Sequence, residues 1–265
     1  MRVLLPTDLS EDSFRAAEMT IKLLGTTHTH YVLVHSYYTG SMSDPMRPSL
    51  LGEIRKGAEE GMHRMETRLL ERFPDLDVRK VVDYGPLYAV IDLEARKSGA
   101  DLLVVHTRHR ATVSLLGSQA TSLVRSSRVP VLELPIAMKE LTIRRILFAD
   151  DGSSIDRATL AMLVTLAVRA KAEIIIAHVA TGRPMEEQVD HRYLFASEFK
   201  GLPMREVTVE HDDVVEALLT TAAREKASLI AVLHRHGGLM HELFHRSTAR
   251  GLEVSGEIPV LVLEQ

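Results

Sequence analysis

The stretch Arg2-Val-Leu-Leu-Pro-Thr-Asp-Leu-Ser10 returns 143 residues later as Arg145-Ile-Leu-Phe-Ala-Asp-Asp-Gly-Ser153. In both copies an apolar run leads into a polar loop that carries an aspartate, Asp8 or Asp151, and a serine. An apolar run followed by a serine that can cap a helix predicts a buried strand, a loop and the start of a helix. The repetition indicates that the chain contains the same folding unit twice.

Three further apolar runs recur in the same order, at 31–35 and 174–178, at 101–105 and 228–232, and at 129–134 and 258–263. Between the second and third strands the offset falls from 143 to 127 residues, so the second copy is 16 residues shorter there. We expect a shorter loop and a shorter second helix in that copy. Helical patterns separate the strands of the first copy, at 10–24, at 50–72 and after Gly85-Pro86. Alternating strands and helices favour a parallel sheet.

The sequence therefore predicts an α/β fold made of two repeated doubly wound domains. Each should form a five-stranded parallel sheet with helices on both faces. A short charged connection near Pro135–Leu141 separates the copies, which places the domains at 1–137 and 142–265.

The composition narrows the classes of partner. Hydrophobic residues make up 45% of the chain and charged residues 26%, as in folded globular proteins. The formal net charge of −4 argues against a nucleic-acid partner held by bulk positive charge. There is no cysteine, and no apolar run reaches the roughly 18 residues of a membrane span. We expect a cytoplasmic protein with neither a nucleic-acid nor a membrane partner.

Both halves resemble the universal stress protein family, and the whole chain is similar to a tandem member with two such domains. The motifs that carry the resemblance are Leu4–Ser10, Leu33-Val-His35, Gly85-Pro86, Asp101–Val105, Gly117-Ser118 and Val129–Leu132. The resemblance implies a strand order of 3-2-1-4-5 in each domain. It also implies that the last strands pair, 131–134 against 260–263, so that one chain forms a pseudo-dimer. Whether two chains also form a homodimer stays open, as does any protein partner.

ATP-binding members of this family carry two glycines, three positions apart, after the fourth strand, and a third glycine with Ser or Thr further on. The first copy has His106 and His109 in place of the first two glycines, and its loop to Gly117-Ser118 is two residues shorter. The second copy keeps only the serine of this pattern, Ser247. Leu233, His236 and Arg246 stand at its three glycine positions. The resemblance thus predicts that the second domain does not hold ATP in the family manner and leaves the first domain open.

A nucleotide site in the first domain would hold ATP, ADP or AMP, with Asp8 toward the nucleoside and the phosphates at a helix N-terminus. The candidate residues are Pro6, Thr7, Asp8, Val34, Thr107, Arg108, Gly117, Ser118 and Gln119. Helix capping is an equal alternative role for Asp8. Two functions remain open: a regulatory stress-response module that binds a nucleotide, and an interaction or scaffold protein whose sites are degenerate in both domains.

Other chemistries find little support in the sequence. No catalytic residues are predicted, and an ATPase would be weak at most. His234, His236, His241 and His245 lie close together in the sequence, but we expect a solvated loop and helix end there rather than a metal site. Asp150 precedes Asp151, and neighbours at a strand end point to opposite sides, so a capping or solvated role is expected for Asp150. His35 and His178 should close the ends of their strands with a hydrogen bond.

Overall fold

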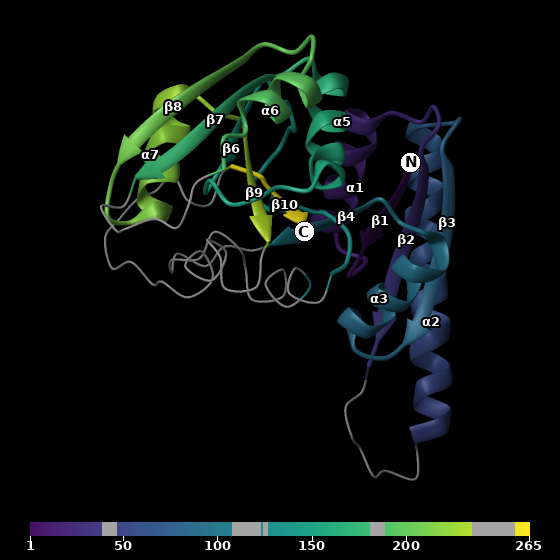
Figure 1. The fold of residues 1–265 in the computed structure, drawn as a ribbon. Coiled ribbons are helices and arrows are strands. Elements are labelled where there is room, and N and C mark those ends of the chain that lie inside the picture. Colours follow the sequence, from purple (N-terminus) through teal and green to yellow (C-terminus); the bar gives the residue numbers. More distant parts are fainter. Residues whose placement is uncertain (39–46, 108–122, 124–126, 181–188, 235–257) are drawn as a thin grey trace. The chain divides into compact units, whose positions relative to one another are not determined.

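The structure is a computed structural model that describes residues 1–38, 47–107, 123, 127–180, 189–234 and 258–265 (Figure 1). The chain divides into two compact units. Unit 1 contains Met1–His106 and Ser126–Val129, and unit 2 contains Thr107–Arg125 and Pro130–Gln265. None of the helices described is long and apolar enough to cross a membrane.

Unit 1 contains four parallel strands in the order β3-β2-β1-β4. The strands are β1 (Arg2–Pro6), β2 (His30–Tyr37), β3 (Asp77–Tyr84) and β4 (Leu102–Thr107). The helices are α1 (Glu11–Leu24), α2 (Arg47–Arg72) and α3 (Leu87–Ser98). β1 lies in the middle of this sheet, with β2 on one side and β4 on the other, and its side chains Val3 and Leu4 are completely buried.

Helix α1 begins and ends where the sequence predicts. The Ser10 hydroxyl accepts a hydrogen bond from the N–H of Ser13 at 3.2 Å, which satisfies one of the free donors of the first turn. Gly25 follows the last turn with a φ of +72°, a backbone conformation that favours glycine. The predicted inner face, which includes Phe14 and Ile21, is buried.

Helix α2 starts at Arg47, slightly before the predicted residue 50. Met62, Met65 and Leu69 of its predicted inner stripe are buried, and α2 packs against β2 and β3. Met65 also reaches the end of β1, because the Thr7 hydroxyl lies 3.2 Å from its sulfur. The long helix therefore covers the place where β1 meets its loop.

Unit 2 contains six strands in the order β5-β10-β9-β6-β7-β8. They are β5 (Val131–Pro135), β6 (Arg145–Ala149), β7 (Glu173–Ala180), β8 (Met204–Glu210), β9 (Leu229–His234) and β10 (Val260–Glu264). The five strands of the second copy are all parallel and have the predicted order 3-2-1-4-5. β5, the last strand of the first copy, runs antiparallel to β10, with Leu132 opposite Leu261. The predicted fold class and the pairing of the two last strands are confirmed.

The helices of unit 2 show the effect of the shorter second copy. A 3-10 turn (Arg157–Leu160) leads into α5 (Ala161–Ala170), and α7 (Val214–Glu225) follows β8. Between β7 and β8, helix α6 (Arg192–Glu198) has 7 residues, whereas its counterpart α2 has 26. The predicted shortening of the second helix is confirmed.

Candidate functional site

In unit 1 the end of β1 brings together the predicted site residues that precede the helix. Pro6 lies opposite Val34 in the parallel register, and the N–H of Thr7 donates to the carbonyl oxygen of Val34 at 2.8 Å. Thr7 is buried, and its hydroxyl lies 2.8 Å from that of Ser13. Val34 is completely buried as well. The side chains of Thr7 and Val34 are thus buried at the carboxyl end of β1. Asp8 is the residue of the predicted nucleotide site that faces solvent here.

Asp8 is held in a fixed local geometry. Its side chain is 64% exposed, and its Oδ1 accepts hydrogen bonds from the Ser10 N–H at 3.0 Å and from the Ser10 hydroxyl. Burial alone would raise the pKa of the Asp8 carboxyl. The hydrogen bonds from Ser10 and Ser13 and the charge of His106 outweigh burial and lower that pKa below its usual value. Ser10, not Asp8, caps α1, so the alternative role of Asp8 as the helix cap is not the one seen.

His106 lies beside this carboxylate. It belongs to β4, which is the neighbour of β1, and its Nε2 lies 3.9 Å from Asp8 Oδ1. His106 stands where ATP-binding relatives are expected to have the first glycine. The imidazole therefore occupies space beside the Asp8 carboxylate. Thr107 ends β4. Arg108, His109, Gly117, Ser118 and Gln119 lie outside the described residues.

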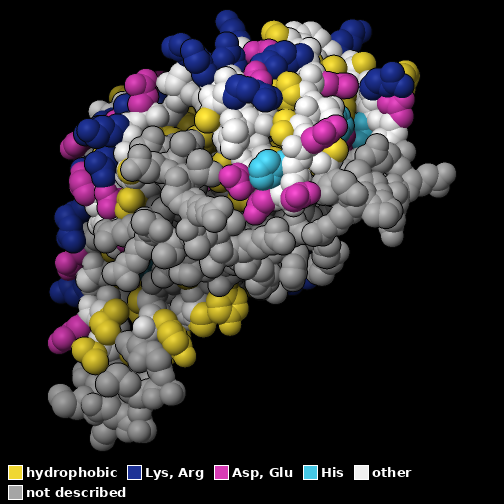
Figure 2. Space-filling model, turned by 90° about the vertical axis from the view of Figure 1, so that its left-hand side faces the viewer, with side chains coloured by type: hydrophobic (Ala, Val, Ile, Leu, Met, Phe, Trp, Pro, Cys, Tyr) yellow, Lys and Arg dark blue, Asp and Glu magenta, His cyan; other side chains and the backbone are white. Residues whose placement is uncertain are grey.

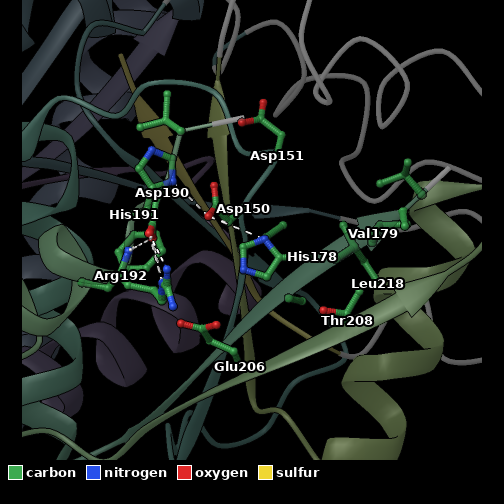
Figure 3. A pocket seen from close by; sticks show the side chains of 16 residues that line it. Asp150, Asp151, His178, Val179, Asp190, His191, Arg192, Glu206, Thr208 and Leu218 are labelled. Atoms are coloured by element: carbon green, nitrogen blue, oxygen red, sulfur yellow. Dashed lines mark hydrogen bonds and ion pairs between the residues drawn. The ribbon is translucent and has the colours of Figure 1, made fainter. Parts of the chain in front are cut away.

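In unit 2 the same sheet end holds a cavity of about 670 Å³. Asp150 and Asp151 follow β6, His178 and Val179 belong to β7, and Leu218 comes from α7. His178 and Thr208 are opposite each other in the register of β7 and β8, and they point to the same face as Glu206. In Figure 3 the His178 ring lies in the middle of the cavity, between Asp150 and Glu206. The sequence did not single out this cavity.

Asp150 is the most buried acidic residue that lines the cavity. It is 4% exposed, and its Oδ2 lies 3.0 Å from Nδ1 of His191 and 3.7 Å from Nδ1 of His178. Its other oxygen accepts the N–H of Gly152 at 3.0 Å. The expectation of a solvated role is therefore wrong, although the bond to Gly152 is a local capping contact of the kind expected. The carboxylate is buried because two imidazoles and a backbone N–H surround it.

Among the described residues that line the cavity, acidic side chains outnumber basic ones. Asp190 pairs with Arg192, and this side-chain hydrogen bond, with the Arg192 N–H, lowers the pKa of Asp190 to about 2. Asp151 and Glu206 add two further carboxylates to the lining. On one face of the molecule, acidic side chains (magenta) gather around a histidine (cyan) in Figure 2.

The histidines named in the sequence analysis make different contacts in the structure. The Nδ1 of His35 lies 2.8 Å from the carbonyl oxygen of Thr7, so His35 closes the strand end by a hydrogen bond, as expected. His178 faces Asp150 instead of a backbone group. His234 lies 2.9 Å from Glu264 Oε2, and His236, His241 and His245 lie outside the described residues. Within the described part of the chain, no group of three or more side chains has a metal-binding arrangement.

Comparison with known proteins decides the family. The profile of the universal stress protein family matches residues 1–135, half of the chain. This chain belongs to the universal stress protein family. Universal stress protein G of Salmonella typhimurium is 28% identical over 141 residues, which cover 49% of this chain and 95% of that protein. Universal stress protein G of Escherichia coli O157:H7 is 27% identical over the same shares of both chains.

Solved structures of universal stress proteins extend the likeness to both halves. A universal stress protein from Archaeoglobus fulgidus matches with a TM-score of 0.67 at 19% identity, over 99% of this chain and 98% of that one. A putative universal stress protein from Pseudomonas aeruginosa UCBPP-PA14 matches with a TM-score of 0.54 at 21% identity, over 99% and 92%. At these identities the likeness shows the fold alone. The tandem architecture of this chain is thus shared with other universal stress proteins.

Proposed function

We propose that this universal stress protein is a cytoplasmic regulatory module of the stress response that binds an adenine nucleotide in its first domain, within residues 1–137. The observation that carries the proposal is Asp8, an exposed carboxylate at the carboxyl end of the central strand of unit 1. Ligands of open α/β sheets bind at that end of the strands. The second domain, residues 142–265, has no part in this nucleotide site.

The local geometry of Asp8 suits the sugar of a nucleotide. A carboxylate is charged at neutral pH and accepts hydrogen bonds, which suits ribose hydroxyls. Because Ser10 fixes one carboxylate oxygen, little side-chain entropy is lost when the other binds a ligand. The wall of the proposed site beneath Asp8 is formed by Pro6, Thr7 and Val34. Thr7 and Val34 are buried, and a backbone hydrogen bond joins them.

The phosphates would be held by backbone N–H groups at Gly117, Ser118 and Gln119, with Thr107 and Arg108 nearby. This half of the proposal rests on the sequence. Free N–H groups at the beginning of a helix and the helix dipole both favour an anion. ATP, ADP and AMP are all candidates, because the sequence does not distinguish the number of phosphates.

A second candidate function is an interaction module that has lost the nucleotide. The specific observation in its favour is His106, whose Nε2 lies 3.9 Å from Asp8 Oδ1 where a glycine would leave room for the ligand. Mass spectrometry of small molecules released by denaturing the purified protein separates the two functions. An adenine nucleotide in near-stoichiometric amount, lost in Asp8→Asn but kept in Asp151→Asn, supports binding in the first domain. Nucleotide-free protein from several preparations supports the interaction module.

A further inference from the structure

We propose that the amino end of the unit 2 sheet docks an acidic segment of a partner protein, one whose carboxylates are interspersed with apolar side chains. This end lies where β6, β7, β8 and β9 begin, and these four parallel strands are neighbours in the sheet (Figure 1). The cavity lies at the other end of the same strands. The proposal does not depend on nucleotide binding.

Each of the three connections that lead from a helix to a strand in unit 2 carries one lysine. Lys171 lies between α5 and β7, Lys200 between α6 and β8, and Lys226 between α7 and β9. Arg144 directly precedes β6, so a cation stands before the start of all four strands. All four side chains are exposed, and within the described part of the chain none of them takes part in an ion pair.

Carboxylates at this end are already held by arginines. Three of them form ion pairs: Glu173 with Arg145 and Arg205, Glu198 with Arg157, and Glu225 with Arg205 and Arg224. The four exposed cations are separate from these pairs, so their charge is available to attract a negatively charged partner from solution.

The first copy lacks this feature at the corresponding end of its sheet. Its three helix-to-strand connections, residues 25–29, 73–76 and 99–101, contain no lysine or arginine, and two of them carry an aspartate, Asp75 or Asp101. Strands β3-β2-β1-β4 nevertheless have the same arrangement as β8-β7-β6-β9. The fold therefore does not require basic connections, and the lysines are a property of the second copy.

Two of these lysines adopt a backbone conformation that suits glycine better. Lys171 and Lys226 end α5 and α7 with φ of 51° and 55°, in the left-handed region. The corresponding helices of the first copy, α1 and α3, end at Gly25 and Gly99, both with positive φ. A side chain raises the energy of left-handed backbone, and the attraction of a lysine to the helix dipole offsets only part of that cost. Stability of the fold thus does not account for a lysine at either position.

Exposed apolar side chains near the lysines indicate the kind of partner. Val168, in the last turn of α5, is 55% exposed, and Met204, the first residue of β8, is 36% exposed. A nucleic-acid backbone could not cover them with apolar groups, and the net charge of −4 opposes a polyanion at longer range. A protein segment that carries both carboxylates and apolar side chains can contact both kinds of group.

The size of this end suits a short segment. Four neighbouring strands span about 15 Å, which is three strand spacings. An extended chain of roughly five residues crosses that distance, so one acidic segment can reach the cations of several connections at once.

Fluorescence anisotropy on the full chain tests the proposal with two labelled peptides. One mixes Glu with Leu and Ser over about eight residues, long enough to cross this end of the sheet, and the other has Gln in place of every Glu. The Glu peptide should bind at least about tenfold more tightly than the Gln peptide, and its affinity should fall as salt is raised.

The double variant Lys171→Gly with Lys226→Gly should weaken binding of the Glu peptide about tenfold or more. Its melting temperature should not fall, because glycine relieves the left-handed backbone. Lys56→Gln with Lys97→Gln, two exposed lysines of unit 1, is the matched control. It removes the same amount of charge and should leave the affinity nearly unchanged.

The proposal is overturned if the Gln peptide binds as tightly as the Glu peptide or if the two double variants bind the Glu peptide alike. It is also overturned if the glycine variant melts at a lower temperature than the wild type, since the lysines would then serve stability. Tighter binding of a DNA duplex, or of vesicles that contain anionic lipid, than of the Glu peptide would overturn it as well and would assign these cations to a phosphate-bearing partner.

Discussion

Asp150 Oδ2 lies 3.0 Å from Nδ1 of His191, although the two residues are 41 positions apart in the sequence, and both side chains are almost completely buried. The pair joins the end of β6 to the residue that precedes α6. It thus attaches α6, the short second helix of unit 2, to the central part of its sheet. In unit 1 the second helix, α2, contacts the sheet through apolar side chains such as Met65.

Asp150→Ala should destabilise unit 2 strongly. Removal of one partner of a buried pair leaves the other polar group without compensation, which costs about 3–5 kcal/mol. Urea unfolding measures the change in the free energy of unfolding. Asp190→Ala, which breaks the exposed pair with Arg192, is the control and should have little effect. Equal losses in the two variants would contradict a special role for Asp150.

The stability that Asp8 contributes should depend on pH in a defined direction. Its folded-state pKa is lowered, so the carboxylate stabilises the fold above the pKa of the unfolded chain, and this contribution is lost as pH falls through the folded pKa. Asp8→Asn should therefore have a lower melting temperature than the wild type at pH 7, and the difference should shrink as pH falls below about 4. A difference that grows in acid would show that the pKa is not lowered.

A proline in the paired last strands should weaken their contact. Leu132 of β5 and Leu261 of β10 lie opposite each other and are completely buried. Leu132→Pro removes a backbone donor and a buried side chain from this pairing, so proteolysis near the connection at 136–142 should accelerate. Lys139→Pro, in the exposed connection itself, is the control. Unchanged proteolysis of Leu132→Pro would contradict the pairing.

Zinc should not stabilise the protein. His234 lies against Glu264, and we still expect no metal site from His234, His236, His241 and His245. The melting temperature should therefore be the same with and without Zn²⁺, since a metal that binds the folded state raises it by mass action. Stoichiometric zinc in protein purified without an affinity tag would show that these histidines do form a site.

The fold could be predicted because its signals are local and repeated. Apolar runs such as Val3-Leu4-Leu5, the capping residue Ser10 and the closing Gly25 each act within a few residues, and the duplication presents many of them twice. The shortening between the second and third strands was also visible as a change of offset, and the structure shows its result in α6.

The cavity of unit 2 could not be predicted in the same way. The neighbours of Asp150 in the sequence predict a capping or solvated role, whereas its main partner His191 lies 41 positions further along the chain. One signal was present: an aspartate stands where the first copy has Thr7, a position that the repeat places at a buried strand end. A charged residue at a buried position requires a partner.

The central claim is that the first domain binds an adenine nucleotide at Asp8. Titration calorimetry with ATP, ADP and AMP at pH 6 and pH 8 tests it most directly, using the wild type and the matched variants Asp8→Asn and Asp151→Asn. Asn keeps the local turn at either position. We expect saturable heat at both pH values that Asp8→Asn abolishes and Asp151→Asn preserves. No heat at millimolar nucleotide at either pH would contradict the claim.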